Sequence, residues 1–360
     1  MSAVSHRLPV TAVVLVVSAI NLAACGSPSS PSSQPTAGAS VQTTLRIGYL
    51  GNLTHAPALI GLDQGYWAAA LGPKVTIQPQ TFNAGGDEVT AFLGGALDAA
   101  FMGPGPATNA FVKSGAVRVV AGATSGGAGL VLKGVPFGSA ADLKGKLLAT
   151  PQLANTQDIA LRAYLLDHGL HTDAQGGGDV RITSPASNSV ALSLFKQGAI
   201  QGAWEPEPWV TRMVVEGGGT EVVNEASLWP NGQFATTLLV VSTDFLSKHP
   251  DVVKNLIKGH LATLDWIQAN GAQASSVAAA DLLSLTNSSL TPAEEATAWS
   301  HLSFTADPEA TSIKTSAANS VRVGLVTNAN VNGIVDIRIL NQLLKNLGRP
   351  VLSAGGLGSA

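Results

Sequence analysis

The chain has 360 residues, of which 45% are hydrophobic and 12% charged, with 39 glycines and a formal net charge of −3. This composition excludes a disordered or coiled-coil protein and is typical of a compact α/β protein with many tight strand-to-helix turns. The small acidic excess argues against a nucleic-acid partner.

A short apolar run follows a single basic residue at the start of the chain. Arg7 precedes "VTAVVLVVSAI", which covers residues 10 to 20. A membrane span needs roughly 20 apolar residues, so this run is too short, whereas it fits the h-region of a secretory signal. We therefore expect residues 1–24 to be removed as a signal peptide, which leaves 19 basic and 23 acidic side chains and a net charge of −4.

The only cysteine, Cys25, ends the sequence "LAAC". This tetrapeptide resembles the lipobox of bacterial lipoproteins and implies that Cys25 carries the lipid (palmitate among its acyl chains). Residues 25–44 are uncharged and rich in Ser, Pro, Gly, Ala and Thr, and such a segment cannot bury enough apolar surface to fold. We expect a tether that holds the protein on the outer face of the cytoplasmic membrane.

Beyond the tether, short β-rich runs alternate with helical patterns. Strands are predicted in a first series over 44–50, 74–82, 97–103 and 117–123, and in a second series over 129–134, 147–151, 179–185, 201–207 and 220–226. This alternation is the βαβ signature of mostly parallel sheets covered by helices. It predicts two α/β units, with crossings between them near Leu130 and within 234–246.

The last third of the chain is predicted to be mainly helical. Residues 249–271 form an amphipathic pattern, and a further helix starts after Thr291 as N-cap, with Pro292 at its first position. The tail 353–360, rich in glycine and serine, is expected to be disordered.

Catalytic motifs are missing from the sequence. "GPGPAT" lacks the Lys-Ser/Thr of a P-loop, the glycine runs are only fragments of a dinucleotide pattern, and neither H-E-x-x-H nor G-x-S-x-G occurs. We therefore expect no enzyme, no catalytic residue, no metal and no cofactor.

From about Leu45 to Leu261 the chain resembles the substrate-binding proteins of ABC importers in the aliphatic sulfonate, taurine and nitrate group. The segments that carry the resemblance are "IGYLGNLTHAPALIGLDQGYW", "GALDAAFMGPGPATNAF", "ADLKGKLLATPQLANTQDIALRAYL" and "GAIQGAWEPEPWVTRMVVEGGGTEVVNEASLWPNGQFATTLLVVSTDFLSKHPDVV". The resemblance implies a two-lobed periplasmic-binding-protein type II fold, with a ligand cleft between the lobes and C-terminal helices. Its expected boundaries are 45–130 and 240–347 for lobe I and 131–239 for lobe II.

Three strand-to-helix corners are the best candidates for binding an anion, because free amides and the helix dipole favour negative charge at a helix N-terminus. They are "GNLTHAP" with Asn52 and His55, "GPGPAT" with Gly103, Pro104 and Gly105, and "QLANTQ" with Asn155, Thr156 and Gln157. In the third corner, Asn155 is the predicted N-cap, and Asp158 three residues later approximates a capping box.

Further candidates lie outside these corners. Gly126 and Gly127 occur in a stretch that resembles the family's cleft loop, and Glu207 matches the glutamate of the family's "EPW" motif. Trp204 and Trp209 could contact an apolar tail, although aromatic residues beside a strand are usually part of the core. Glu205 and Glu207 at the rim would welcome an amine, unless the neighbouring prolines direct both away. Asn188, at the start of a predicted helix, completes the set.

The sequence therefore predicts a monomeric, lipid-anchored solute-binding protein whose partners are a small anionic solute and the permease and ATPase subunits of an ABC importer. The preferred ligand is an aliphatic sulfonate or taurine. Nitrate, another small anion or a thiamine-precursor pyrimidine are the alternatives within binding proteins. An exported enzyme on the same fold is the alternative from another class.

Overall fold

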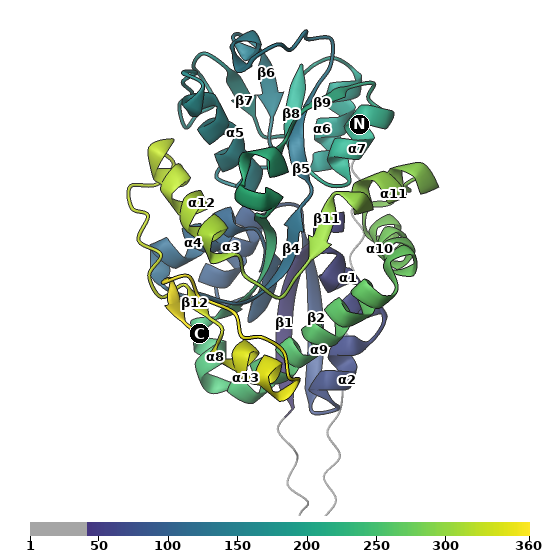
Figure 1. Ribbon diagram of the computed structural model, residues 1–360, viewed down its shortest axis with the longest axis vertical. Coiled ribbons are helices and arrows are strands. Elements are labelled where there is room, and N and C mark those ends of the chain that lie inside the picture. The colour runs from purple at the N-terminus through teal and green to yellow at the C-terminus, as the bar shows by residue number, and fades with distance from the viewer. Residues whose placement is uncertain (1–41) are drawn as a thin grey trace, which may run out of the picture. The chain divides into compact units, whose positions relative to one another are not determined.

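The computed structural model describes residues 42–360, so the predicted signal peptide, Cys25 and most of the tether lie outside the described residues. Two β-sheets form the framework, with strand orders β13-β12-β4-β10-β3-β1-β2 and β7-β6-β8-β5-β9, and β11 pairs with β4 (Figure 1). We call the first sheet and its helices lobe I, and the second sheet and its helices lobe II.

The strands of lobe I are β1 (Thr43–Leu50), β2 (Val75–Phe82), β3 (Ala99–Met102), β4 (Val117–Gly126), β10 (Ala235–Ser242), β11 (Leu302–Phe304), β12 (Val335–Asp336) and β13 (Gly358–Ser359). Those of lobe II are β5 (Ala128–Leu132), β6 (Leu147–Ala149), β7 (Arg181–Thr183), β8 (Gly202–Pro206) and β9 (Thr220–Asn224). In lobe I, β1 runs parallel to β2 and β3, and in lobe II β6 runs parallel to β7 and β8. The predicted α/β fold class is confirmed.

Helices follow most of the parallel strands. They are α1 (Ala56–Asp63), α2 (Tyr66–Leu71), α3 (Gly85–Leu93), α4 (Pro104–Ser114), α5 (Thr156–Asp167), α6 (Asn188–Lys196), α7 (Trp209–Val215), α8 (Thr243–Lys248), α9 (Pro250–Ala269), α10 (Gly271–Thr286), α11 (Pro292–Ser300), α12 (Ala310–Arg322) and α13 (Arg338–Asn346). The short 3-10 turns are η1 (Leu53–His55), η2 (Ala140–Leu143), η3 (Glu225–Leu228) and η4 (Pro230–Gly232). No helix among residues 42–360 has the length and apolar character needed to cross a membrane.

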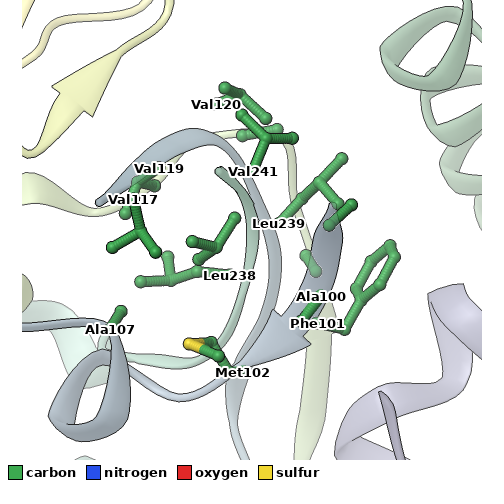
Figure 2. Packing of buried hydrophobic residues seen from close by; sticks show 14 of the residues in the cluster. Ala100, Phe101, Met102, Ala107, Val117, Val119, Val120, Leu238, Leu239 and Val241 are labelled. Atoms are coloured by element: carbon green, nitrogen blue, oxygen red, sulfur yellow. The ribbon is translucent and has the colours of Figure 1, made fainter. Parts of the chain in front are cut away.

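The core of lobe I explains why its central strands read as nearly continuous apolar runs. Residues such as Phe101 and Met102 on β3, Val119 on β4 and Leu238 on β10 are fully buried. Figure 2 shows Met102, Val119 and Leu238 on one side of the strands and Phe101 on the other. Helices cover both faces of such a sheet, so both sets of alternating side chains are apolar.

The chain changes sheets at two points. It passes from β4 to β5 through Gly126 and Gly127, whose φ angles of +84° and +73° suit glycine, and it returns between β9 and β10. The whole of β5 therefore belongs to lobe II and the whole of β10 to lobe I, a few residues earlier in each case than the expected boundaries at 130 and 240. An apolar strand run does not indicate which sheet it joins, which explains the difference.

The C-terminal part of the chain is ordered. Helix α9 confirms the predicted amphipathic pattern, and α11 begins at Pro292 behind a full capping box of Thr291 and Glu294. The expectation of a disordered tail is wrong, because Leu357 is buried and β13 pairs in parallel with β12. Buried Ala354 and Leu357 and the two residues of β13 hold the tail, and so short a pattern leaves no periodic signal in the sequence.

Candidate ligand-binding cleft

The carboxyl ends of the parallel strands from both sheets converge on one small cavity. This inner cavity, of about 20 Å³, is lined from lobe I by Leu50, Asn52, Thr54, His55, Asn83, Gly103 and Thr236, and from lobe II by Pro151, Asn155, Thr156, Gln157, Asn188 and Pro206. Ligands of open α/β sheets bind at this end of the strands. The volume is enough for about one water molecule.

A larger hollow adjoins the inner cavity. This outer cavity, of about 270 Å³, is lined by Gly51, Asn52, Thr81, Phe82, Asn83, Ser187, Asn188, Ser189, Trp209, Leu285 and Thr286. Asn52, Asn83 and Asn188 line both cavities, so they form the boundary between them. The outer cavity combines amide and hydroxyl groups with the apolar side chains of Phe82, Trp209 and Leu285.

A chain of three side chains crosses from one lobe to the other at this boundary. The indole Nε1–H of Trp209 in lobe II donates to Oδ1 of Asn52 in lobe I at 2.8 Å. Nδ2 of Asn188 in lobe II donates to the same oxygen at 3.4 Å. All three side chains are buried, so this relay is part of the contact between the lobes.

The α5 corner, residues 151–158, supplies amide groups to the inner cavity. Asn155 is the N-cap of α5, as predicted, and its Oδ1 accepts from the N–H of Thr156 at 2.8 Å. Within residues 42–360, the N–H of Gln157 donates to no protein acceptor, and Gln157 lines the inner cavity. This corner therefore has a free donor beside the cavity.

Asp158 does not complete a capping box, contrary to the approximate match in the sequence. Its carboxylate accepts from the N–H of Ala154 at 2.9 Å, the hydroxyl of Thr150 at 3.0 Å and Nε of Arg162 at 2.9 Å. Ala154 has a φ of +61°, which turns the chain so that its own N–H, rather than that of the N-cap, faces the carboxylate. The Asp158–Arg162 pair is almost fully buried and holds the corner in shape.

The α4 corner, residues 103–106, looks similar in sequence, but the first turn of its helix, residues 104–106, offers no free amide. Pro104 and Pro106 have no N–H, and the N–H of Gly105 donates to Oγ1 of Thr156 at 3.3 Å. A Cβ atom on Gly103 would lie 2.2 Å from the same hydroxyl oxygen. Gly103, Pro104 and Gly105 thus let the lobes approach, and of these three only Gly103 lines the inner cavity.

His55 is fully buried beside the inner cavity, and burial lowers the pKa of this imidazole to about 3. The N–H of Leu50 donates to its Nδ1 at 3.2 Å. The neutral ring therefore carries its proton on Nε2, which makes His55 an uncharged donor.

Trp204 is a core residue. Its indole is fully buried in lobe II, packs 5.6 Å from the Tyr164 ring centroid and donates to Oε2 of Glu225 at 2.7 Å. It lines neither cavity, so Trp204 is part of the core and does not contact a ligand there. Gly126 and Gly127 also line neither cavity and serve the crossing between the sheets.

The two glutamates beside the prolines point away from both cavities. Pro206 lines the inner cavity, whereas Glu205 and Glu207 are buried and line neither cavity. Glu207 accepts from the hydroxyl of Thr211 at 3.0 Å and lies 2.6 Å from Nδ1 of His301, whose pKa is raised mainly by this hydrogen bond. The idea that two rim carboxylates attract an amine is therefore wrong for this structure.

Several cavity residues escaped the sequence reasoning. The missed residues include Thr54, Thr81, Phe82, Asn83, Ser187, Ser189, Thr236, Leu285 and Thr286. Trp209 lines the outer cavity, as the sequence had suggested for contact with an apolar tail. Asn83 follows the strand at 74–82 at the same sheet edge as Asn52, so its position could have been inferred. Leu285 and Thr286 come from the end of α10, more than 200 residues from β1 and β2, and carry no local signal.

Comparison with known proteins places this geometry in context. The chain is 25% identical over 237 residues to a binding protein of Brucella abortus, covering 65% of this chain and 70% of the relative. The nitrate-binding protein NrtA from Synechocystis has a TM-score of 0.72 at 15% identity and covers 89% of this chain and 92% of its own. The aliphatic sulphonate-binding protein SsuA from Escherichia coli has a TM-score of 0.64 at 18% identity, covering 82% and 96%.

These similarities confirm the periplasmic-binding-protein fold and the resemblance drawn from the sequence. The model of the NMT1-like family matches residues 38–283, which is more than half of the chain and includes almost every residue that lines the two cavities. The chain therefore belongs to the NMT1-like family.

Proposed function

We propose that the protein is the extracytoplasmic solute-binding component of an ABC importer and that it captures a small organic anion, with an aliphatic sulfonate or taurine as the preferred class. Similarity to binding proteins for sulfonates and nitrate supports the role, and the cleft supports the ligand class.

The observation that carries the proposal is a cleft that offers hydrogen bonds without a formal charge. Neither cavity is lined by Lys, Arg, Asp or Glu, and His55 is neutral. The N–H of Gln157 lies at the positive end of the α5 dipole, and amides in this position stabilise an anionic head group. One oxygen of the head group, about the size of a water molecule, fits the inner cavity, where it would accept from this amide and from His55 Nε2.

The size of the outer cavity favours an organic anion over an inorganic one. At about 270 Å³ it has room for a short carbon chain, and Phe82, Trp209 and Leu285 provide apolar contact for it. A nitrate ion would leave most of this volume to water, so it would gain little from the apolar side chains.

A thiamine-precursor pyrimidine is the second candidate. The absence of a cationic side chain from both cavities fits a neutral polar ring, and Phe82 and Trp209 could contact its faces. An exported enzyme is disfavoured, because the lining of the two cavities contains neither a charged general acid or base nor a cysteine.

A thermal-shift screen of alkanesulfonates, taurine, nitrate and pyrimidines tests the ligand class. A ligand at 100 times its dissociation constant adds about 2.7 kcal/mol to the free energy of unfolding, so a true ligand raises the midpoint clearly. Calorimetric titration should then give a stoichiometry near one, with no product formed on long incubation. A shift from pyrimidines alone would favour the second candidate, and turnover of any ligand would favour an enzyme.

The proposal also includes lipidation at Cys25, a monomeric state and docking on permease and ATPase subunits. The Cys25→Ala variant should partition into the soluble fraction, because the chain has no other cysteine to carry the lipid. If the variant stayed in the membrane after a salt wash although its signal peptide had been cleaved, the proposed anchor would be wrong. Size-exclusion chromatography of the soluble variant tests the monomer.

A further inference from the structure

The orientation of the Asn188 amide is fixed by its neighbours. An indole N–H can only donate, so the Asn52 atom that accepts from Trp209 must be its oxygen. An oxygen at this place accepts only from a donor, so the Asn188 atom that faces it is the nitrogen Nδ2. The remaining atom of the Asn188 amide is therefore the carbonyl oxygen Oδ1.

This oxygen has no hydrogen-bond partner. Asn188 is only 6% exposed, and its Oδ1 is among the buried polar atoms of the described residues that find no donor in the protein. Asn188 is also the first residue of α6, and it lines both cavities. Buried acceptors are nearly always paired, which indicates that something other than the protein donates to Asn188.

From this arrangement we infer that the ligand carries a hydrogen-bond donor close to its anionic head, and that Asn188 is the residue that selects for it. This inference rests on the proposed function and narrows its ligand class. An amino- or hydroxyalkanesulfonate has such a donor, whereas nitrate and simple alkanesulfonates have none. A site with a buried acceptor discriminates strongly against a ligand that leaves it unpaired.

Ethanesulfonate and 2-hydroxyethanesulfonate are the matched probes, because they have the same charge and differ by one hydroxyl group. Calorimetric titration of the protein should show binding of the hydroxylated probe at least tenfold tighter, which corresponds to about 1.4 kcal/mol. The affinity of taurine should be close to that of the hydroxylated probe. Equal affinities for the two probes would overturn the inference and leave sulfonate binding intact, whereas no binding of any sulfonate would count against the proposed function itself.

Two variants assign the preference to Asn188. In Asn188→Ala the affinity ratio of the two probes should fall to about one, while in Asn346→Ala, which alters an exposed asparagine that lines neither cavity, the ratio should persist. Asn52→Ala should also reduce the ratio, since the Asn188 amide then loses the partner that orients it, and it provides a second test if Asn188→Ala is poorly folded. A ratio that survives in both Asn188→Ala and Asn52→Ala would show that the donor is recognised elsewhere.

Discussion

The α4 corner and the α5 corner have similar sequences but contribute differently to the cleft. Each follows a buried strand and begins a helix with small or polar residues. In the α4 corner, prolines and the Gly105–Thr156 hydrogen bond leave no amide of the first helical turn for a ligand. In the α5 corner, the N–H of Gln157 is free beside the inner cavity.

This difference shows that a helix N-terminus in a cleft can serve either contact between lobes or ligand binding. The free amide of the α5 corner depends on Asp158, which holds the strained Ala154 and pairs with Arg162. The α4 corner depends on the absence of side chains at Gly103 and Gly105. The α5 corner is stabilised by a buried ion pair, and the α4 corner by the close approach of the two lobes at its glycines.

Asp158→Ala should produce the largest effect. It leaves Arg162 buried without its partner, which typically costs about 3–5 kcal/mol of the free energy of unfolding. Denaturant unfolding measures the change. Asp244→Ala, which breaks the exposed pair with Lys248, should leave the midpoint nearly unchanged. The double variant Asp158→Leu/Arg162→Met should regain much of the loss, and a small effect of Asp158→Ala would show that the α5 corner is not held by this pair.

Gln157→Pro should weaken the binding of the best sulfonate at least tenfold. The substitution deletes the free N–H of the α5 corner, and a hydrogen bond to a charged group contributes roughly 1.5–3 kcal/mol. Gln157→Ala keeps the amide and is the matched control. Both variants must first show a normal unfolding midpoint without ligand. Equal losses in the two variants would assign the role to the side chain and remove the contrast with the α4 corner.

Gly103→Ala should weaken binding about tenfold by keeping the lobes apart, because its Cβ would approach Thr156 Oγ1 to 2.2 Å. Gly271→Ala, at a position with open space around the new methyl group, is the control and should bind normally. The double variant Gly103→Ala/Thr156→Ala removes the 2.2 Å contact and leaves two contacts of 3.3 Å, to Thr156 Cβ and to the Thr236 carbonyl oxygen, so it should recover part of the affinity. Failure of this recovery would mean that Gly103 acts in some way other than lobe contact.

Sulfonate affinity should stay constant between about pH 5 and pH 8. The depressed pKa of His55, about 3, keeps the imidazole neutral throughout this range, and no other titratable side chain lines either cavity. Titrations at several pH values check this. Tighter binding at pH 5 than at pH 7 would show that a positive charge forms in the cleft. The anion would then be assigned to a position beside His55 and not at the α5 corner.

Much of the framework could be predicted from the sequence, because apolar runs between glycine- and proline-rich turns mark parallel strands with covered faces. Asn155 was recognisable as an N-cap, because capping depends only on residues that are neighbours in the sequence. A free amide at Thr156 or Gln157 was also expected from the sequence; in the structure the N–H of Thr156 donates to Asn155, and the N–H of Gln157 is the free one.

The remaining features depend on contacts between distant segments. The prolines of "GPGPAT" reveal the missing amides. Only the folded chain shows that the N–H of Gly105, between them, donates to Thr156. The direction of Glu205 and Glu207 depends on which face of β8 meets the cleft, and the wall at Leu285 depends on where α10 ends. None of these can be read from spacing along the chain.

Trp209 gives the molecule a built-in optical signal. Its indole reaches from lobe II to Asn52 in lobe I and has the Arg212 guanidinium 5.0 Å above its ring. Separation of the lobes would break the hydrogen bond and expose the ring to water, which changes the wavelength and intensity of tryptophan emission. Because Trp209 also lines the outer cavity, the fluorescence of the unlabelled protein should report both the arrival of a solute and the closing of the cleft around it.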